Sequence, residues 1–97
     1  MLELKYEIFF EPVVISEDLK LIGKKDKERI KKAINVKITS HPDLYSLPLR
    51  RPLDGYRKLR VGKYRIIFKL NEKKKICLII GIRHRENIYS ITEKRLN

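Results

Sequence analysis

Five positive charges and no acid fall within nine residues near the middle of the chain, from Arg57 to Arg65. A second basic cluster, Arg83-His84-Arg85, follows about twenty residues later, and Tyr89 comes soon after it. Guanidinium and ammonium groups bind phosphate oxygens, and tyrosine rings stack on unpaired bases. This combination predicts a surface that holds the phosphodiester backbone of a nucleic acid.

Such residues also suit the cleavage of RNA by attack of a 2′-hydroxyl on the adjacent phosphorus. That reaction needs a base, an acid for the leaving 5′-oxygen, and cations that stabilise the charged transition state. A lysine held beside several arginines is moved toward use as a base, because its ammonium form is disfavoured. The sequence has no glycine-rich phosphate loop, no carboxylate cluster for Mg²⁺ and no Cys/His pair at a useful spacing. We therefore expect chemistry without a metal or another cofactor.

Three strands are expected to carry the basic residues. The apolar pattern predicts them at Tyr56–Val61, Tyr64–Leu70 and Lys75–Arg83. Gly62-Lys63 and Asn71–Lys74 supply the two turns, so the strands form a meander of two hairpins. This order places both basic clusters on neighbouring strands.

Side chains alternate between the two faces of a strand, so the apolar pattern indicates where the cations point. Alternate residues from Tyr64 to Leu70 are apolar and are expected to pack on helices. The residues expected on the other, open face are Tyr56, Lys58, Arg60, Arg65 and Arg83. No acid in the same strands pairs with these cations, and their mutual repulsion favours an anion between them. The alternative is that Glu3, Glu7 or Glu93 neutralises them.

The same alternation predicts the two faces of the last strand. The residues expected in the core are Ile76, Leu78, Ile80 and Ile82. Those expected on the open face beside Arg83 are Cys77, Ile79 and Gly81. The glycine either leaves room for a ligand or marks a β-bulge, and both readings remain open.

The segment before the meander is expected to form one strand and a helical hairpin. Leu2–Phe10 alternates as a strand does, and Pro12 suits the first turn of a helix that ends near Ile22, with Gly23 as its stop. Ile15, Leu19 and Ile22 are the apolar stripe of this first helix. A second helix is expected from a cap at Asp26 to about Ser40, with Ile30, Ile34 and Ile38 on its buried face.

A loop and a short tail complete the expected fold. Pro42–Gly55 contains three prolines and is expected to be a loop, and the polar tail Asn87–Asn97 a short strand or helical turn. The order is β-α-α-β-β-β. We expect a single α+β domain spanning residues 1–97, with a small antiparallel-dominated sheet and the helical hairpin packed on one face.

The net charge points to a polyanionic partner. Lys and Arg number 24 against 12 acids, which gives a formal charge of +12. Nucleic acid fits best, an acidic protein fits the same charge, and a lysine-rich solubilising surface is the alternative. The single cysteine, Cys77, indicates a reducing compartment. The longest apolar run, Ile76–Ile82, is too short to span a membrane, so we expect a cytoplasmic protein.

Two stretches together resemble the RelE/ParE superfamily of bacterial and archaeal toxins, most closely its RelE branch. One runs from Tyr56 to Phe68 and the other from Gly81 to Tyr89. The resemblance extends over the whole chain, because the order of elements agrees as well. It implies the toxin of a type II toxin–antitoxin system, a ribosome-dependent endoribonuclease that cuts mRNA at A-site codons by 2′-hydroxyl attack without a metal.

The resemblance also implies roles for individual residues. Lys58 is the implied base or charge stabiliser, Arg65 and Arg83 stabilise the phosphate of the transition state, and Tyr89 orients or stacks on the substrate base. The residues implied in RNA binding are Tyr56, Arg57, Arg60, Lys63 and Arg85. One departure is evident, because the first catalytic lysine of the family falls at Tyr56 here.

The implied partners are the ribosome, its mRNA, and an acidic RelB-like antitoxin that forms a hetero-oligomeric complex with the toxin. Arg57 follows Tyr56 directly, but strand alternation places it on the opposite face, so it does not replace the charge of the family's first catalytic lysine. Two other functions remain as alternatives, and the presence of Arg65, Arg83 and Tyr89 argues against the first. One is a ParE-like inhibitor of gyrase, and the other is a non-catalytic module that binds RNA or the ribosome.

Overall fold

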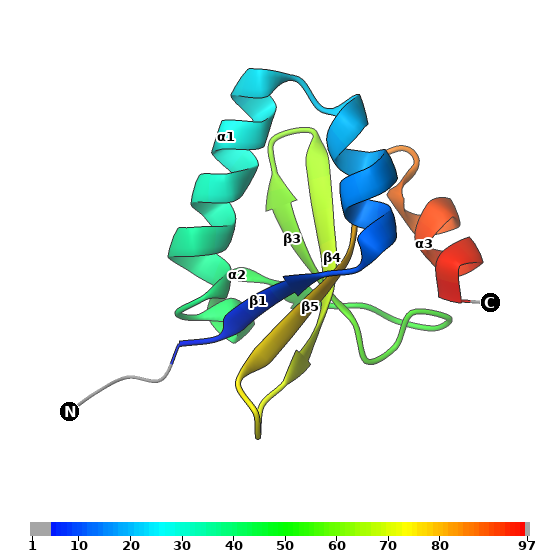
Figure 1. Ribbon diagram of the computed structural model, residues 1–97. Helices are drawn as coiled ribbons and strands as arrows, with labels where there is room; N and C mark the ends of the chain where they lie inside the picture. The colour runs from blue at the N-terminus through cyan, green and yellow to red at the C-terminus, as the bar shows by residue number, and fades with distance from the viewer. Residues whose placement is uncertain (1–4, 97) are drawn as a thin grey trace.

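The computed structural model describes residues 5–96, which form a five-stranded sheet with helices on both of its faces (Figure 1). The strands lie in the order β1-β5-β4-β3-β2. Strand β1 is parallel to β5, and all other neighbours are antiparallel. The strands are β1 (Glu7–Phe10), β2 (Leu47–Pro48), β3 (Arg57–Val61), β4 (Tyr64–Asn71) and β5 (Ile76–His84). The predicted α+β class and antiparallel-dominated sheet are confirmed.

The helical hairpin covers one face of this sheet, as predicted. Its first arm is made of two helical turns, η1 (Val14–Asp18) and η2 (Leu19–Leu21), and its second arm is α1 (Lys24–Ala33) continued by η3 (Ile34–Ile38). The isoleucines at positions 30, 34 and 38 are buried, and they face Leu59, Ile66 and Phe68 across the main core. Their spacing of four residues keeps them on one helical face.

The first arm buries a stripe that agrees only in part with the predicted one, because Ile22 and Leu19 pack in or against the core as predicted but Ile15 does not. Val14, Asp18 and Ile22 are buried, whereas Ile15 is 56% exposed. The wide turn of η1 keeps residues at a spacing of four on the sheet side. A carboxylate therefore occupies the middle of an otherwise apolar stripe.

Several predicted boundaries are corrected. Helix α1 has Gly23 as its N-cap, and Asp26 lies inside the first turn, 3.9 Å from the guanidinium of Arg29. The expected loop contains a short helix, α2 (Pro42–Tyr45), and the two-residue strand β2. The strand predicted at Leu2–Phe10 begins at Glu7 in the structure. Of its predicted positions, residues 2–4 lie outside the described residues.

A bulge in β5 changes which of its side chains face the helical hairpin. Ile67 lies opposite Gly81, but Phe68 lies opposite Ile79, so Ile80 is an extra residue. Before the bulge, Cys77 and Ile79 therefore pack in the main core. The predicted core positions Leu78 and Ile80 instead join a second cluster on the opposite face, and only Ile82 is where alternation predicted it.

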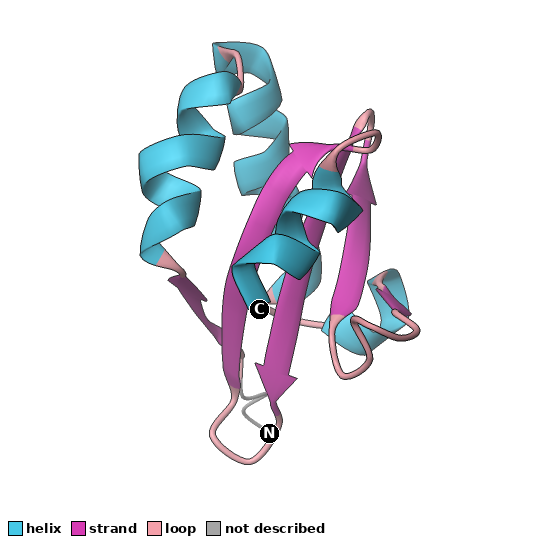
Figure 2. Cartoon of the chain, turned by 90° about the vertical axis from the view of Figure 1, so that its right-hand side faces the viewer, coloured by secondary structure: helices cyan, strands magenta, loops and turns pink. Residues whose placement is uncertain are grey.

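The tail forms a nine-residue helix, α3 (Ile88–Leu96), which lies on the sheet face opposite the hairpin (Figure 2). Buried Ile67, Ile80 and Ile88 form the second cluster beneath it. A Cβ atom on Gly81 would lie 3.1 Å from Cδ1 of Ile88, so the glycine permits the helix to approach the strand. Of the two readings left open for Gly81, the space for a ligand is occupied by α3, whereas a β-bulge does lie beside the glycine, at Ile80. Within residues 5–96, no helix has the length and apolar character to cross a bilayer.

Candidate active site

The open face brings Lys58 and Tyr89 together. Lys58 comes from β3, where it lies opposite Ile67, and Tyr89 comes from the first turn of α3. The Lys58 ammonium donates a hydrogen bond of 3.3 Å to the tyrosine Oη, and its Nζ lies 5.7 Å from the ring centroid. The two residues are 31 positions apart, and they meet because α3 packs on this face. The pair places one cation and one phenol at the same point of the surface.

Three arginines lie in a row beside this pair. Arg60 pairs with Arg65 across β3 and β4, and Arg65 pairs with Arg83 across β4 and β5. The register therefore agrees with the predicted shared face. Nη1 of Arg65 donates to the carbonyl oxygens of Gly62 and Tyr64, at 3.0 and 2.9 Å. Its guanidinium is thus held at the β3–β4 turn, while Arg60 is exposed.

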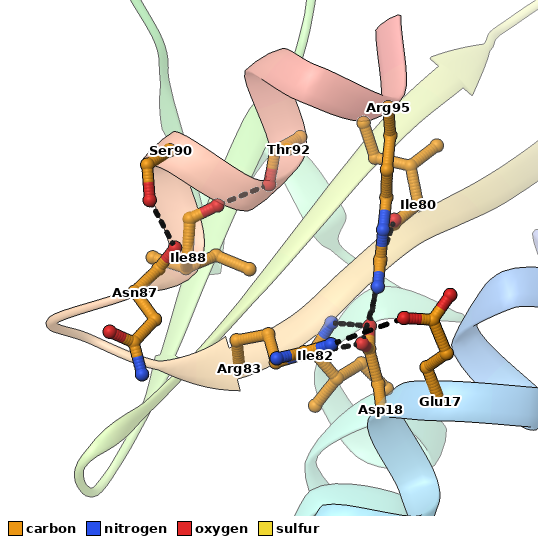
Figure 3. Close-up of polar contacts among 10 residues, drawn as sticks. All are labelled: Glu17, Asp18, Ile80, Ile82, Arg83, Asn87, Ile88, Ser90, Thr92 and Arg95. Carbon is orange, nitrogen blue, oxygen red and sulfur yellow. Dashed lines mark hydrogen bonds and ion pairs between the residues drawn. The ribbon is translucent and has the colours of Figure 1, made fainter.

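Arg83 is not an unpaired cation, which corrects the prediction. Its Nε donates a hydrogen bond of 2.5 Å to Oδ1 of Asp18, and Nη2 lies 3.8 Å from Oε1 of Glu17 (Figure 3). Both acids belong to the first arm of the hairpin. Strand alternation points only to acids in the strands and near the two ends of the chain, so it does not reveal these two. The position of Asp18 midway between Val14 and Ile22 was the available signal.

Asp18 is completely buried and negatively charged. Burial acts to raise the pKa of its carboxyl, but hydrogen bonds from Arg95, Arg83 and the backbone N–H of Ile82 outweigh burial, so the pKa lies below its usual value. The hydrogen bond to Asp18 likewise raises the pKa of Arg95.

Tyr56 lies two residues before Lys58 and lines a depression of about 690 Å³ on the same face. The ammonium of Lys69 sits 5.5 Å from the centroid of its ring. Leu78 and Pro48 contribute apolar surface to this depression. A half-buried ring that borders an open depression beside a cation suits the stacking of an unpaired base next to its phosphate.

The remaining predicted RNA-binding residues fall into two groups. Arg57 is tied to the segment around α2, since its Nε donates to Oγ of Ser46 at 2.7 Å and its Nη2 to the Ser46 carbonyl oxygen at 2.9 Å. Lys63 and Arg85 are exposed and adjacent, because the Arg85 N–H donates to the Lys63 carbonyl oxygen at 2.8 Å. Among the described residues, no group of three or more His, Cys, Asp or Glu side chains is arranged to hold a metal ion.

The chain is similar to known toxins in sequence and in fold. Residues 14–89 match the model of a family described as ParE toxin of type II toxin-antitoxin system, parDE. The toxin–antitoxin complex RelBE2 from Mycobacterium tuberculosis contains a chain with a TM-score of 0.77 and 22% identity, over 84% of this chain and 99% of that one. No curated protein sequence matches significantly.

Two further solved structures share the fold. A free double mutant of the toxin RelE from E. coli has a TM-score of 0.70 and 22% identity, over 96% of this chain and 99% of that one. The archaeal RelE–RelB complex from Pyrococcus horikoshii OT3 has a TM-score of 0.64 and 22% identity, over 82% of this chain and 94% of that one.

Proposed function

The chain belongs to the ParE toxin family of type II toxin–antitoxin systems, within the RelE/ParE superfamily, and from this premise we propose that it is an endoribonuclease that cleaves mRNA. The observation that carries the proposal is the contact between Lys58 and Tyr89 on a face lined by arginines. A gyrase poison needs no such pair, whereas 2′-hydroxyl attack needs a proton-transfer group beside stabilising cations.

In this proposal each residue acts on a defined part of the RNA. Lys58 is the base or charge stabiliser at the 2′-oxygen, and Tyr89 orients the neighbouring base and assists proton transfer. Arg65 and Arg83 stabilise the charge that develops on the phosphate. The reaction needs no metal, because the 2′-hydroxyl is the nucleophile and the side chains supply the positive charge. The substrate is mRNA in the ribosomal A site.

The residues proposed to bind RNA are arranged around this centre. Tyr56 offers a stacking surface in its depression, and the exposed cations are Arg60, Lys63 and Arg85. We leave Arg57 out of direct phosphate binding, because Ser46 occupies two of its nitrogen atoms.

The proposal is tested by primer extension on an mRNA in a purified translation reaction. Wild-type protein should cut within A-site codons only when ribosomes are present. Lys58→Ala should lower the rate about 10²- to 10⁴-fold, as expected for loss of a proton-transfer group. The control is Lys25→Ala, which removes the same charge from an exposed position on α1. Intact mRNA with the wild-type protein, or equal cutting by both variants, would contradict the proposal.

Inhibition of gyrase is the second candidate, because the matching family is described by its ParE members. A supercoiling assay with purified gyrase separates the two functions. Inhibition of supercoiling by a protein that leaves mRNA intact would favour this candidate. A protein without either effect would be the third alternative, a module that binds RNA or the ribosome without cleaving it.

We further propose an antitoxin as partner, because RelBE2 and RelE–RelB were solved as complexes, and the charge of +12 favours an acidic one. An apolar groove of about 360 Å³ lies between β1 and the helical hairpin, and Lys27 and Lys31 stand among its lining residues. Its apolar lining includes Ile8, Phe10, Leu19, Ile30 and Ile34. The apolar face of an amphipathic segment would match the apolar lining of this groove, and acidic residues beside it would match the two lysines.

Charge reversal tests this placement of the antitoxin. Lys27→Glu with Lys31→Glu should weaken binding of the antitoxin encoded beside the toxin by about tenfold or more, mainly in the association rate at low salt. Lys25→Glu with Lys32→Glu changes the charge of the same helix by the same amount away from the groove. Equal affinities of the two double variants would place the antitoxin elsewhere.

A further inference from the structure

The buried carboxylate of Asp18 joins three separate parts of the fold. It accepts hydrogen bonds from the N–H of Ile82 in β5, from the guanidinium of Arg83 at the end of the same strand, and from Arg95 in the last turn of α3. We propose that Asp18 is a positioning residue, which holds Arg83 and the helix that carries Tyr89 in one fixed arrangement. The proposal rests on the proposed cleavage of RNA.

The first step is where the carboxylate lies. Strand β1 pairs with β5 only as far as Ile79, so no strand of residues 5–96 lies beside the later residues of β5 on that side. The Ile82 N–H donates to Oδ2 of Asp18 at 2.9 Å, and the Ile80 carbonyl oxygen accepts from Nη1 of Arg95 at 2.9 Å. Two side chains thus complete the edge of β5 that β1 leaves open. Asp18 is therefore attached to the strand that bears Arg83 (Figure 3).

The second step is the attachment of α3. Arg95 donates from Nη1 to Oδ2 of Asp18 at 2.8 Å and from Nη2 to Oδ1 at 2.6 Å. This two-pronged contact fixes direction as well as distance. At the other end of α3, Ile88 is fully buried against the sheet. The helix is therefore held at both ends, and Tyr89 in its first turn is held at Lys58.

The third step is the charge balance. Asp18 is one anion between two guanidinium groups, and the side chains of Arg83 and Arg95 are only 16% and 14% exposed. Without the carboxylate the two cations would repel each other in a poorly hydrated site. Within residues 5–96, no acceptor binds Nη1 of Arg83, so one nitrogen remains for a phosphate oxygen while Nε is fixed.

The decisive comparison uses two neighbouring residues of α3. Arg95→Met removes the contact with Asp18, whereas Lys94→Met removes the same charge from an exposed position. Arg95→Met should lower kcat for ribosome-bound mRNA about 10- to 100-fold with little change in KM, because misplaced groups slow the chemical step. Lys94→Met should leave kcat unchanged, and Arg95→Lys should restore part of the loss. All rates are expressed per folded molecule, measured by circular dichroism.

A second set of variants separates positioning from folding. Asp18→Asn keeps the shape of the side chain and removes its charge, and the double variant with Arg95→Met also removes one of the two cations. Because both residues act through one contact, the double variant should be no slower than the slower single variant. Amide exchange along α3 should be faster in each of these variants than in Lys94→Met.

The outcomes distinguish this inference from the proposed function. If wild-type protein cuts mRNA but Arg95→Met matches Lys94→Met in kcat, Asp18 is not a positioning residue and the nuclease proposal stands. A rise in kcat, or rate losses that multiply in the double variant, would also overturn the inference. If the wild type does not cut, the nuclease proposal fails, and with it the positioning role, whatever amide exchange shows about the attachment of α3.

Discussion

At the scale of single residues, the buried acid Asp18 binds two of the many basic side chains of the protein. The folded pKa of Asp18 lies below the ordinary value of 3.8, because its hydrogen bonds to Arg95, Arg83 and the Ile82 amide outweigh burial. As the pH falls, Asp18 therefore becomes protonated at a higher pH in the unfolded chain than in the folded protein. The contribution of Asp18 to stability is complete above about pH 4 and is lost as the pH falls through the folded pKa.

The lowered pKa of Asp18 predicts how its contribution to stability changes in acid. Asp18→Asn should lower the free energy of unfolding at pH 7 by about 3 kcal/mol, because it leaves two partly buried guanidinium groups without their anion. The loss should shrink as the pH falls through the lowered folded pKa of Asp18, because the wild-type carboxylate then becomes protonated as well. Urea unfolding at several pH values measures this difference. A loss of equal size at both ends of the range would contradict the assigned charge.

Tyr56 yields a prediction about RNA binding. Tyr56→Ala should weaken binding of a short single-stranded RNA by about 1–3 kcal/mol, the usual contribution of one stacked base, and Tyr56→Phe should retain the affinity. Tyr45→Ala is a matched control, because Tyr45 also lies beside a lysine, with Lys37 Nζ 5.6 Å from its ring, but outside the depression. Quenching of a 2-aminopurine base in the RNA reports the stacking. Equal quenching with both alanine variants would exclude Tyr56 as the stacking surface.

Cys77 provides a probe of unfolding. The thiol is fully buried, and burial raises its pKa to about 12, so it is neutral and inaccessible in the folded protein. Reaction with a disulfide reagent at pH 8 should be limited by opening of the fold, and it should become fast in denaturant. A fast reaction in native buffer would show that β5 opens locally.

At the scale of elements, the packing of α3 on β5 requires a glycine. Gly81→Val should lower the stability by about 1–3 kcal/mol and loosen α3, because even a Cβ atom would lie 3.1 Å from Ile88 and 3.3 Å from Oγ1 of Thr92. Gly23→Val is the comparison, since a Cβ atom there has no neighbour within 4 Å. Thermal unfolding and amide exchange of α3 measure both effects. Similar losses in the two variants would argue against close packing at Gly81.

The elements also show which parts of the fold were predictable from the sequence. The β3–β4–β5 meander and the buried stripe of Ile30, Ile34 and Ile38 follow from local apolar periods, which the structure preserves. The faces of β5 were not predictable, because a bulge at Ile80 reverses the alternation without a local marker other than Gly81. The tail was predicted as a short strand or a helical turn, and the full length of α3 was not predictable, because its buried face is short and one of its main anchors, Asp18, is far away in the sequence.

The candidate site likewise contains features that were predictable from the sequence and features that were not. Lys58 and Arg65 on one face were predictable from strand alternation, and their register agrees with that expectation. The partner of Arg83 was not, because the spacing of Val14, Asp18 and Ile22 indicates at most that Asp18 is buried, and nothing in the sequence connects it to a residue 65 positions away. The contact of Tyr89 with Lys58 depends on how α3 docks, which only the tertiary structure determines.

At the scale of the whole molecule, the charge of +12 has opposite effects on folding and on binding. Raising NaCl from about 0.05 to about 0.5 M should raise the melting temperature, because salt screens the repulsion among like charges. The same change should weaken RNA binding steeply, with a slope that reports the number of phosphates engaged. Melting curves and filter binding in one buffer series compare the two trends. A melting temperature that falls with salt would mean that the ion pairs outweigh the general repulsion.

The distance along the chain between Asp18 and Arg95 has a consequence for the order of events during synthesis. The hairpin that carries Asp18 leaves the ribosome early, but its ion partners are 65 and 77 residues further on. Strand β1 likewise waits for β5, its only strand neighbour among the described residues. Contacts of such long range form late. The nascent chain therefore holds an unpaired acid until Arg83 has emerged, and the proposed cutting surface is completed only after Arg95 has followed it.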